Sequence, residues 1–367
     1  MNNKVVITGI GSISPLGIGT DLLWNSYKNF MQSGDKSVFE NSNIDLEAID
    51  ICKYLKKNNP NFLDRVTFFL IISAFEALQN AEVDLNYTNT ERFGIVTGTK
   101  YGPIDTLAKY YKGLHEKGPN GVSPILFPST VINLPASQVG IEYSVHGPNI
   151  TLTQGDSSGI DALGMAYGMI KRNECDIILC CSGDANTDLM KKLQFNNGDE
   201  DKHVSEGAVS FIIESYEHAI NRGAHIHAQI GGYNNHICDI NGESKQDITN
   251  LYDSLLGGKS DEIDAYFGTY DQNEESDIEF QATRDYFADN DNIIATSSKQ
   301  SIGDYHSVSG LHNVLFALKS MSENEVSGYN LSSASNSVQQ KKEIRRALCN
   351  AFSKEGLNSS LIIEHCN

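Results

Sequence analysis

Short apolar runs alternate with longer amphipathic or small-residue segments along this chain, a pattern typical of an α/β protein with buried strands. Asp64–Ala81 predicts a helix, because Asp64 can cap its start and apolar residues recur at helical spacing after it. Ser158–Ile170 predicts a second helix, rich in small residues. The strands predicted in the first part of the chain are Lys4–Gly9, Phe93–Gly98, Asn149–Thr153, Asp176–Ser182 and Val209–Glu214.

The second part of the chain repeats this pattern in the same order. We match four of these strands, those that begin at Lys4, Phe93, Asn149 and Asp176, to the segments Ala224–Gly232, Ile263–Thr269, Asn292–Ser298 and Ser360–Cys366. The shared order predicts a duplicated α/β unit with halves at residues 1–223 and 224–367. No low-complexity linker separates the halves, so we expect them to pack as one unit around a shared layer of helices.

Composition narrows the possible partners and the cellular compartment. The chain has 28 basic and 47 acidic residues, a net charge of −19, which disfavours binding to nucleic acid or to an anionic membrane surface. Its seven cysteines are odd in number and show no zinc-ribbon spacing, which fits a reducing compartment. Neither a signal peptide nor an apolar run of membrane-spanning length is evident, so we expect a cytoplasmic protein without a metal.

Three long blocks of the sequence carry a resemblance to a known family. They are the opening VVITGIGSISPLGIG, the stretch Lys117–Asn149 and the stretch Ser205–Tyr233. In these blocks the chain resembles the β-ketoacyl synthase branch of the thiolase superfamily. The resemblance implies a thiolase-like fold, in which two duplicated βα halves form a five-layered α-β-α-β-α arrangement. The family's carboxyl-terminal Gly-Phe-Gly-Gly loop is degraded here to the segment Phe352–Asn358.

The resemblance also identifies three positions that carry catalysis in active ketosynthases. The family's nucleophilic cysteine corresponds to Asp156, and its two histidines correspond to Phe267 and Asp304. A carboxylate is a weak nucleophile towards a thioester, phenylalanine donates no hydrogen bond, and Asp304 adds a charge of the same sign as Asp156. No catalytic residue of the family is therefore intact. Lys299, five residues before Asp304, is expected to serve packing or a local ion pair.

This pattern resembles the chain length factor, the ketosynthase β subunit of type II polyketide synthases. Gly159–Leu163 matches the run that follows the lost cysteine in that family, although Asp156 replaces the glutamine often found there. The resemblance implies a heterodimer with a catalytic ketosynthase and no cofactor of its own. The phosphopantetheine arm of an acyl carrier protein would enter through the partner, because an acidic subunit repels acidic carriers. Whether the product is an aromatic polyketide or a polyene stays open.

In that family the growing chain extends into a tunnel at the dimer interface. The match places the tunnel helix at Phe127–Gln138, where Pro128 and Pro135 indicate a late start or a kink. Helical spacing puts four residues on one face as candidates for the tunnel wall and for setting chain length. They are Phe127, Thr130, Val131 and Leu134. Ordinary dimer packing is the alternative explanation for this apolar face.

Three other functions stay open at this point. A malonyl-carrier decarboxylase would need no cysteine, but it would need the two histidines that are lost. A serine hydrolase is another alternative, because Gly155–Gly159 fits G-x-S-x-G with Ser157 as nucleophile. In the thiolase register, however, Ser157 turns into the start of the helix. A homodimeric scaffold without a role in polyketide synthesis is the third alternative.

Overall fold

The chain folds into a mixed α/β structure whose strands form one continuous hydrogen-bonded order. Its two parts, one from each half of the chain, are described below as two sheets, with helices between them and on both outer faces. The computed structural model describes residues 4–34, 43–196, 203–237, 245–270, 277–290, 292–331, 337–353 and 356–366. Within these residues there are eleven α-helices and a 13-stranded sheet. All structural statements below refer to this part of the chain.

The first half of the chain contributes six strands and seven α-helices. The strands are β1 (Val5–Ser14), β2 (Gly17–Ile18), β3 (Phe93–Gly98), β4 (Asn149–Leu152), β5 (Ile177–Asp184) and β6 (Gly207–Ser215). The helices are α1 (Thr20–Ser33), α2 (Arg65–Asn80), α3 (Ile104–Lys117), α4 (Leu134–Tyr143), α5 (Ser158–Lys171), α6 (Asp188–Asn196) and α7 (Tyr216–Asn221). The predicted strands and both predicted helices are found, with ends shifted by a few residues. Asp64 caps α2, because its carboxylate accepts a hydrogen bond from the Val66 amide.

The second half contributes the remaining strands and helices. The strands are β7 (Ala228–Ile237), β8 (Ala265–Gly268), β9 (Ile294–Ser297), β10 (Glu325–Asn330), β11 (Ser337–Lys341), β12 (Arg346–Phe352) and β13 (Leu357–Glu364). The helices are α8 (Lys245–Leu256), α9 (Ile278–Tyr286), α10 (Ser298–Ile302) and α11 (Ser309–Glu323). The degraded loop Phe352–Asn358 includes the last residue of β12 and the first two of β13, and its residues 354 and 355 lie outside the described residues.

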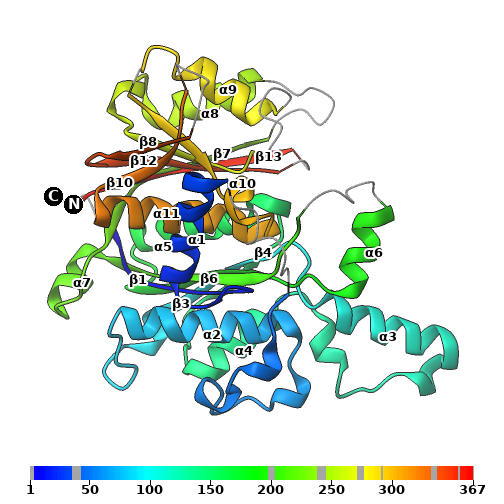
Figure 1. The fold of residues 1–367 in the computed structure, drawn as a ribbon. Helices are drawn as coiled ribbons and strands as arrows, with labels where there is room; N and C mark the ends of the chain where they lie inside the picture. Colours follow the sequence, from blue (N-terminus) through cyan, green and yellow to red (C-terminus); the bar gives the residue numbers. More distant parts are fainter. Residues whose placement is uncertain are drawn as a thin grey trace.

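Five layers are visible when the sheets are viewed edge-on (Figure 1). Helices α8 and α9 cover the sheet of the second half, α5 and α11 fill the centre, and α2 and α4 cover the sheet of the first half. The two sheets are joined where β1 pairs with β7. Three apolar clusters match this arrangement, one in the central layer and one beneath each outer helix layer. The expected α-β-α-β-α arrangement is therefore confirmed.

The strand order shows the duplication directly. In the first half the order is β1-β6-β5-β3-β4, and in the second it is β7-β13-β12-β8-β9. In both halves the third and fourth strands of this order pair in parallel, and the second strand is antiparallel to both of its neighbours. The division at residue 223 remains our proposal for the boundary between the halves.

One of the four strand matches was wrong. Ser360–Cys366 falls largely in β13, which occupies the place of β6, whereas the counterpart of β5 is β12. The two segments resemble each other because both lie mostly in buried strands, and burial on both faces makes different strands look alike in sequence. The match at the other three strands agrees with the topology.

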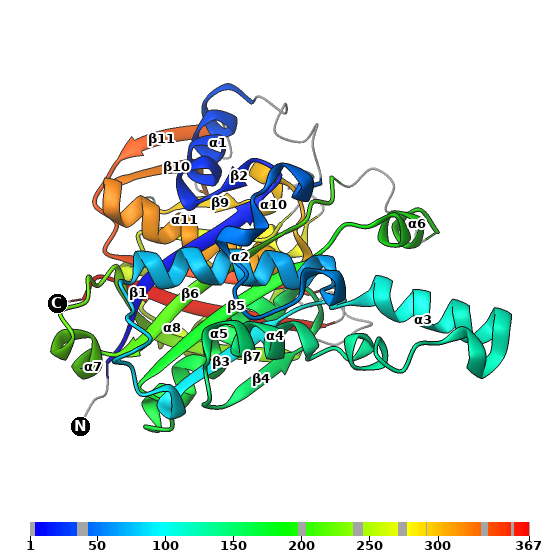
Figure 2. The same ribbon diagram turned by 90° about the horizontal axis from the view of Figure 1, so that it is seen from below.

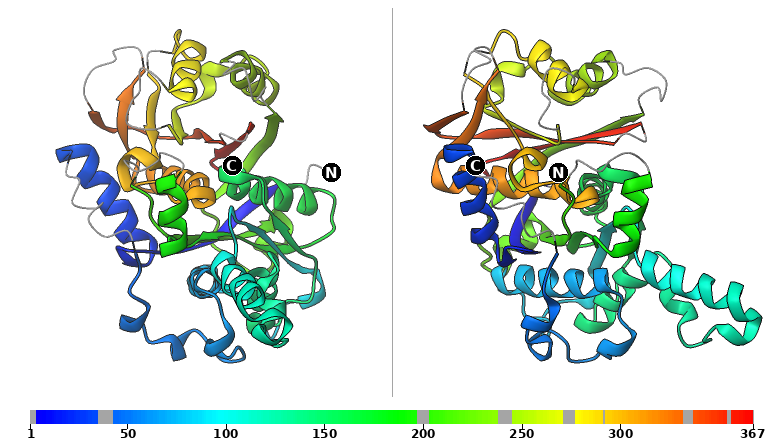
Figure 3. Two further views of the ribbon diagram at one scale, coloured as in Figure 1. Left: turned by 90° about the vertical axis from the view of Figure 1, so that its right-hand side faces the viewer. Right: turned by 45° about the vertical axis from the view of Figure 1, so that its right-hand side comes forward.

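Helix α3 and the turns that follow it extend away from the layered body (Figures 2 and 3). None of the α3 residues is buried, although the helix is amphipathic.

No helix within the described ranges is both long enough and apolar enough to cross a membrane.

Candidate functional site

The turn that links β4 to α5 places Asp156 at the amino-terminal end of a central helix. Gly155 takes the left-handed conformation, with φ 75°, and begins a single 3-10 turn, Gly155–Ser157. The Ser158 hydroxyl closes the turn, because it accepts from the Gln154 amide at 2.7 Å and donates to the Gly155 carbonyl at 2.7 Å. The carboxylate of Asp156 therefore lies next to the positive end of α5.

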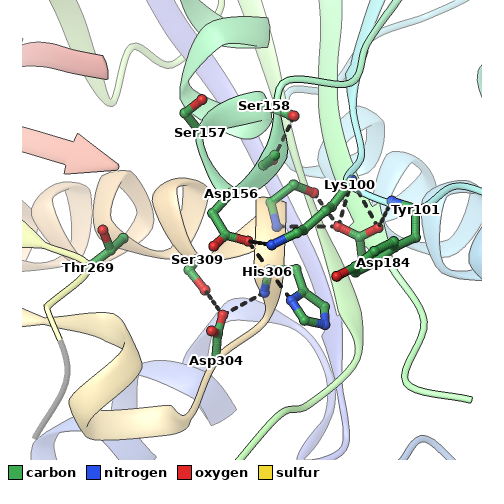
Figure 4. A network of polar contacts seen from close by, with 12 residues as sticks. Lys100, Tyr101, Asp156, Ser157, Ser158, Asp184, Thr269, Asp304, His306 and Ser309 are labelled. Atoms are coloured by element: carbon green, nitrogen blue, oxygen red, sulfur yellow. Dashed lines mark hydrogen bonds and ion pairs between the residues drawn. The ribbon is translucent and has the colours of Figure 1, made fainter. Parts of the chain in front are cut away.

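Asp156 is buried in a cluster of charged side chains drawn from both halves of the chain (Figure 4). Its carboxylate lies 3.0 Å from the Lys100 ammonium and 3.7 Å from the Lys299 ammonium. His306 Nδ1 lies 3.9 Å away. Only 8% of the Asp156 side chain is exposed, so these contacts replace most of its hydration.

Asp304 joins the same cluster through Lys299, whose ammonium lies 3.2 Å from the Asp304 carboxylate. Asp304 also accepts hydrogen bonds from the His306 amide at 2.8 Å and the Ser309 hydroxyl at 3.3 Å. Burial acts to raise the pKa of Asp304, but the charges of Lys299, His306 and Lys100 outweigh it and hold this pKa well below its usual range. The expected ion pair of Lys299 is thus present. Asp304 does add a second carboxylate beside Asp156, and Lys299 contacts both of them.

Lys100 is the residue of this cluster that the sequence did not point to. It directly follows Thr99 at the carboxyl end of β3, and Asp156 follows β4, the parallel neighbour of β3. The carboxyl ends of adjacent parallel strands meet at one edge of a sheet, which brings together residues 56 positions apart. Charged residues directly after buried parallel strands were the signal that could have found Lys100.

His306 also belongs to the cluster. It lies two residues after Asp304 in the sequence. The structure brings His306 beside Asp156 as well. Its ring packs edge-on against Tyr101, with ring centroids 5.1 Å apart. His306 takes a positive φ of 52°, which is unusual for a residue with a side chain.

Phe267, at the third catalytic position, supplies no polar group. It is fully buried in β8 and belongs to the apolar cluster of the central layer. Two residues on, Thr269 donates to Glu279 at 3.0 Å, so its hydroxyl serves the outer helix α9 (Figure 4 shows it apart from the Asp156 contacts). Burial and the nearby Asp277 raise the pKa of Glu279.

Ser157 faces away from the charged cluster (Figure 4). It is fully buried, and its hydroxyl donates to the Asp161 carboxylate at 2.9 Å and to the Gln154 carbonyl at 3.1 Å. A nucleophilic serine needs an exposed oxygen and a base that takes its proton. The geometry of Ser157 fits the start of a helix, as the thiolase register requires, and gives the hydrolase alternative no support.

The four candidate tunnel residues do not share one helix face. Phe127–Thr130 forms a 3-10 turn, and α4 starts only at Leu134, so the helix begins late, as the prolines indicate. Phe127 is 56% exposed and Val131 42% exposed, whereas Leu134 is buried in the body. Thr130 is half-buried, and its hydroxyl donates to the Phe127 carbonyl at 2.7 Å. The prediction of a single helical face was therefore wrong, and a tunnel role for these residues remains a proposal.

No group of three or more histidine, cysteine, aspartate and glutamate side chains within the described ranges is arranged to hold a metal ion. In the Asp156 cluster, two ammonium groups are matched by two carboxylates. The arrangement is charge-balanced without a ligand. It holds no thiol or exposed hydroxyl that could carry an acyl group.

Comparison with known families agrees with this architecture. Residues 52–199 match the family model for the β-ketoacyl synthase, N-terminal domain. Among curated proteins, the 3-oxoacyl-[acyl-carrier-protein] synthase 2 of Staphylococcus aureus (strain COL) is 28% identical over 258 residues, covering 63% of this chain and 62% of the relative. The synthase 2 of Vibrio cholerae shows the same identity and coverage. The matches thus span less than two thirds of the length of these relatives.

Solved structures match over the whole chain. The ishigamide ketosynthase/chain length factor has a TM-score of 0.81 at 18% identity and is covered completely, as is this chain. A type II polyketide synthase acyl-carrier protein in complex with its ketosynthase, AntDE:AntF, gives 0.81 at 19% identity. A β-ketoacyl synthase from Burkholderia phymatum gives 0.81 at 17%. Residues 52–199 are thus similar to a ketosynthase amino-terminal domain, and the chain as a whole has the thiolase-like fold of these structures.

Proposed function

We propose that this chain is a non-catalytic chain length factor. It pairs with an active ketosynthase in type II polyketide biosynthesis and shapes the tunnel for the growing poly-β-ketoacyl chain. One observation carries the proposal: the position of the acyl-accepting cysteine holds Asp156, which is ion-paired with Lys100 and with Lys299. The side chain that would have to attack a thioester is therefore a buried carboxylate that is ion-paired with two ammonium groups.

The remainder of the site supports the same conclusion. Condensation needs donors that stabilise the enolate formed on decarboxylation of an extender unit. Phe267 has no donor, and Asp304 accepts hydrogen bonds instead of donating them. The fold is that of an acyl-transferring enzyme, while the chemistry of the three key positions is lost. A subunit of this kind acts through a partner that keeps the cysteine and both histidines.

An apolar surface is available for that partner. Six large apolar side chains between α3 and the end of α4 are 39–70% exposed in the single chain. These residues are Ile125, Leu126, Phe127, Val131, Ile132 and Ile141. Clustered exposed apolar side chains of this size mark protein interfaces. Strand β4 lies next to this surface in sequence and ends the sheet, since β3 is its one neighbour in the described part. An exposed sheet edge of this kind favours pairing with another chain.

The same surface accounts for the proposed tunnel wall. Phe127 and Val131 are exposed here, so a partner would enclose them, while Leu134 is buried in the body. Thr130 has the smallest side chain of the four, and its hydroxyl donates to the Phe127 carbonyl. Carrier docking falls to the partner, because the net charge of −19 on this subunit repels an acidic carrier protein.

The first test is native mass spectrometry of this chain alone and together with a ketosynthase encoded beside it. We expect a one-to-one complex in which an acyl label is carried by the partner's cysteine alone. A homodimer that ignores ketosynthases would overturn the proposal and favour a scaffold. Turnover of malonyl-carrier by this chain alone would favour a decarboxylase, for which the location of His306 beside Asp156 is the one supporting observation.

The second test changes the proposed tunnel wall. Thr130→Trp in the reconstituted complex should shorten the polyketide products, because a bulky indole in the proposed wall would narrow the tunnel. Tyr87→Trp, at a 90% exposed position outside this surface, is the matched control and should leave product length unchanged. Products are measured by mass spectrometry. An unchanged length distribution for Thr130→Trp, in a complex that still assembles, would remove this residue from the tunnel.

A further inference from the structure

The loop that carries Lys100 is fixed over the Asp156 site by a second buried carboxylate. Asp184, at the end of β5, is fully buried and accepts hydrogen bonds from the Lys100 amide at 3.1 Å and the Tyr101 amide at 3.0 Å. It also accepts from the Thr99 hydroxyl at 2.9 Å. The backbone around Lys100 is therefore held at several points and is not a free surface loop.

Asp184 holds the opposite side of the site as well. The amide and the hydroxyl of Ser307 both donate to Asp184, and Ser307 directly follows His306. One carboxylate thus fastens both segments whose side chains lie over Asp156. Between them, Tyr101 and His306 make ring contact, and the Lys100 ammonium reaches Asp156 (Figure 4).

The exposed fractions show the result of this arrangement. Asp156 and Lys299 each keep 8% of their side chain exposed, and Lys100, the outermost of the three, keeps 16%. The polar atoms of the site are thus directed at one another. In the described chain the carboxylates and ammonium groups of the cluster already contact one another, without any rearrangement.

We propose that Lys100 is the closing residue of this site. Its side chain covers Asp156 and, with Tyr101 and His306, excludes an acyl thioester from the position where an active relative carries its nucleophile. Closure is a property of this chain alone. Only the identity of the excluded ligand, a phosphopantetheine thioester, rests on the proposed function. The consequence is that a growing chain held by the complex has one attachment point, on the partner.

Closure is tested first in the unmodified protein by reductive methylation of lysines, quantified peptide by peptide. Lys112, whose side chain is 75% exposed, is the internal reference. We expect Lys100 to react at least about tenfold more slowly than Lys112, because access then needs local opening. In Asp156→Asn the Lys100 rate should rise towards that of Lys112. Equal rates in the unmodified protein would show that the side chain swings free and would overturn the proposal.

A second experiment separates cover from charge. Asp156→Cys introduces a thiol that neutral iodoacetamide can alkylate, with the exposed Cys52 as reference in the same molecule. Adding Lys100→Met keeps the side-chain bulk without the charge, and adding Lys100→Ala removes both. If Lys100 closes the site, only Lys100→Ala raises alkylation at position 156, by about tenfold.

The opposite result has a distinct signature. If Lys100 acts only through its charge, both second substitutions slow alkylation equally, because a nearby ammonium favours the reactive thiolate. That result would overturn closure. Native mass spectrometry of Lys100→Ala with the ketosynthase reports separately on the proposed function. Lys100 lies outside the apolar surface, so Lys100→Ala should leave the complex with the ketosynthase intact. If the unmodified protein does not bind the ketosynthase, the proposed function fails, whereas the labelling experiments decide closure by themselves.

Discussion

Two turns of this protein share one backbone design and differ in chemistry. The turn Gly155–Ser158 leads into α5, and the turn His306–Ser309 leads into α11, at matching places in the two halves. Each begins with a residue of positive φ, 75° at Gly155 and 52° at His306. Each is closed by a serine hydroxyl that accepts an amide hydrogen bond, at 2.7 Å from Gln154 and at 2.9 Å from Tyr305.

The helices that follow begin alike and then diverge. Gly159 and Gly310 come next, and each lets its helix approach the opposite half, since a side chain at Gly159 would meet the Ser307 carbonyl and one at Gly310 would meet Ile160. Two positions further, Asp161 accepts from Ser157, Tyr233 and Ser359, whereas both ring nitrogens of His312 lack a partner.

This difference shows which features depend on backbone geometry and which depend on chemistry. The turn, its serine and its glycine are needed to seat two helices against each other in the central layer, and both halves keep them. The side chains at the tip of each turn differ, which fits the proposed non-catalytic role. Lys299 connects the two turns, because it binds Asp156 in the first and Asp304 just before the second.

The largest effect should follow from removing this connection. Lys299→Met leaves two buried carboxylates close together, and we expect a loss of about 3–5 kcal/mol in the free energy of unfolding. Denaturant unfolding measures it. Adding Asp304→Asn should recover part of the loss, because one of the two charges is removed. Lys100→Met should cost less, since Asp156 keeps Lys299. Equal losses for the two lysines would contradict the proposed connection.

The second effect tests the hydrogen bonds of the first helix. Asp161→Ala removes an acceptor shared by three hydroxyl groups, at a position that is 2% exposed. Ser157 keeps the Gln154 carbonyl as acceptor, so the main loss falls on Tyr233 and Ser359. We expect destabilisation of about 2–3 kcal/mol, measured by the same unfolding experiment. Ser157→Ala removes one donor only and is the milder control. A loss below that of Ser157→Ala would mean that the hydroxyl groups find other partners.

The sequence predicted most of the backbone and part of this site. The buried strands and α2 follow from apolar runs and a capping aspartate, which are local signals. Asp156 and Asp304 were found because a motif gives their positions. Lys100 was missed because its role depends on which strands are adjacent, and its local signal, a charged residue directly after a buried strand, does not say which strand lies beside it. The match of Ser360–Cys366 to β5 was wrong for a related reason. An apolar run predicts a buried strand, but it does not show which strands lie beside it in the sheet.

The next smaller effect depends on pH and belongs to the second helix. Burial lowers the pKa of His312 from 6.5 to about 3. Between these values the unfolded chain binds a proton that the folded chain does not, so His312 makes stability fall as pH falls through this window. The free energy of unfolding should fall between pH 7 and pH 5, and His312→Leu, of similar volume, should make this fall smaller by about 1–2 kcal/mol. Parallel pH profiles for the two proteins would contradict the burial of a neutral ring.

The smallest effect concerns the first residue of each turn. Gly155→Ala should cost about 1 kcal/mol, because alanine disfavours positive φ. His306→Gly relieves the same strain in the second turn but removes the ring contacts with Asp156 and Tyr101, so the two effects should nearly cancel. In an Asp156→Asn background the carboxylate beside the ring is already absent, and His306→Gly should then stabilise the protein. If His306→Gly has the same effect in both backgrounds, the ring is held by packing against Tyr101, and its contact with the Asp156 carboxylate contributes nothing.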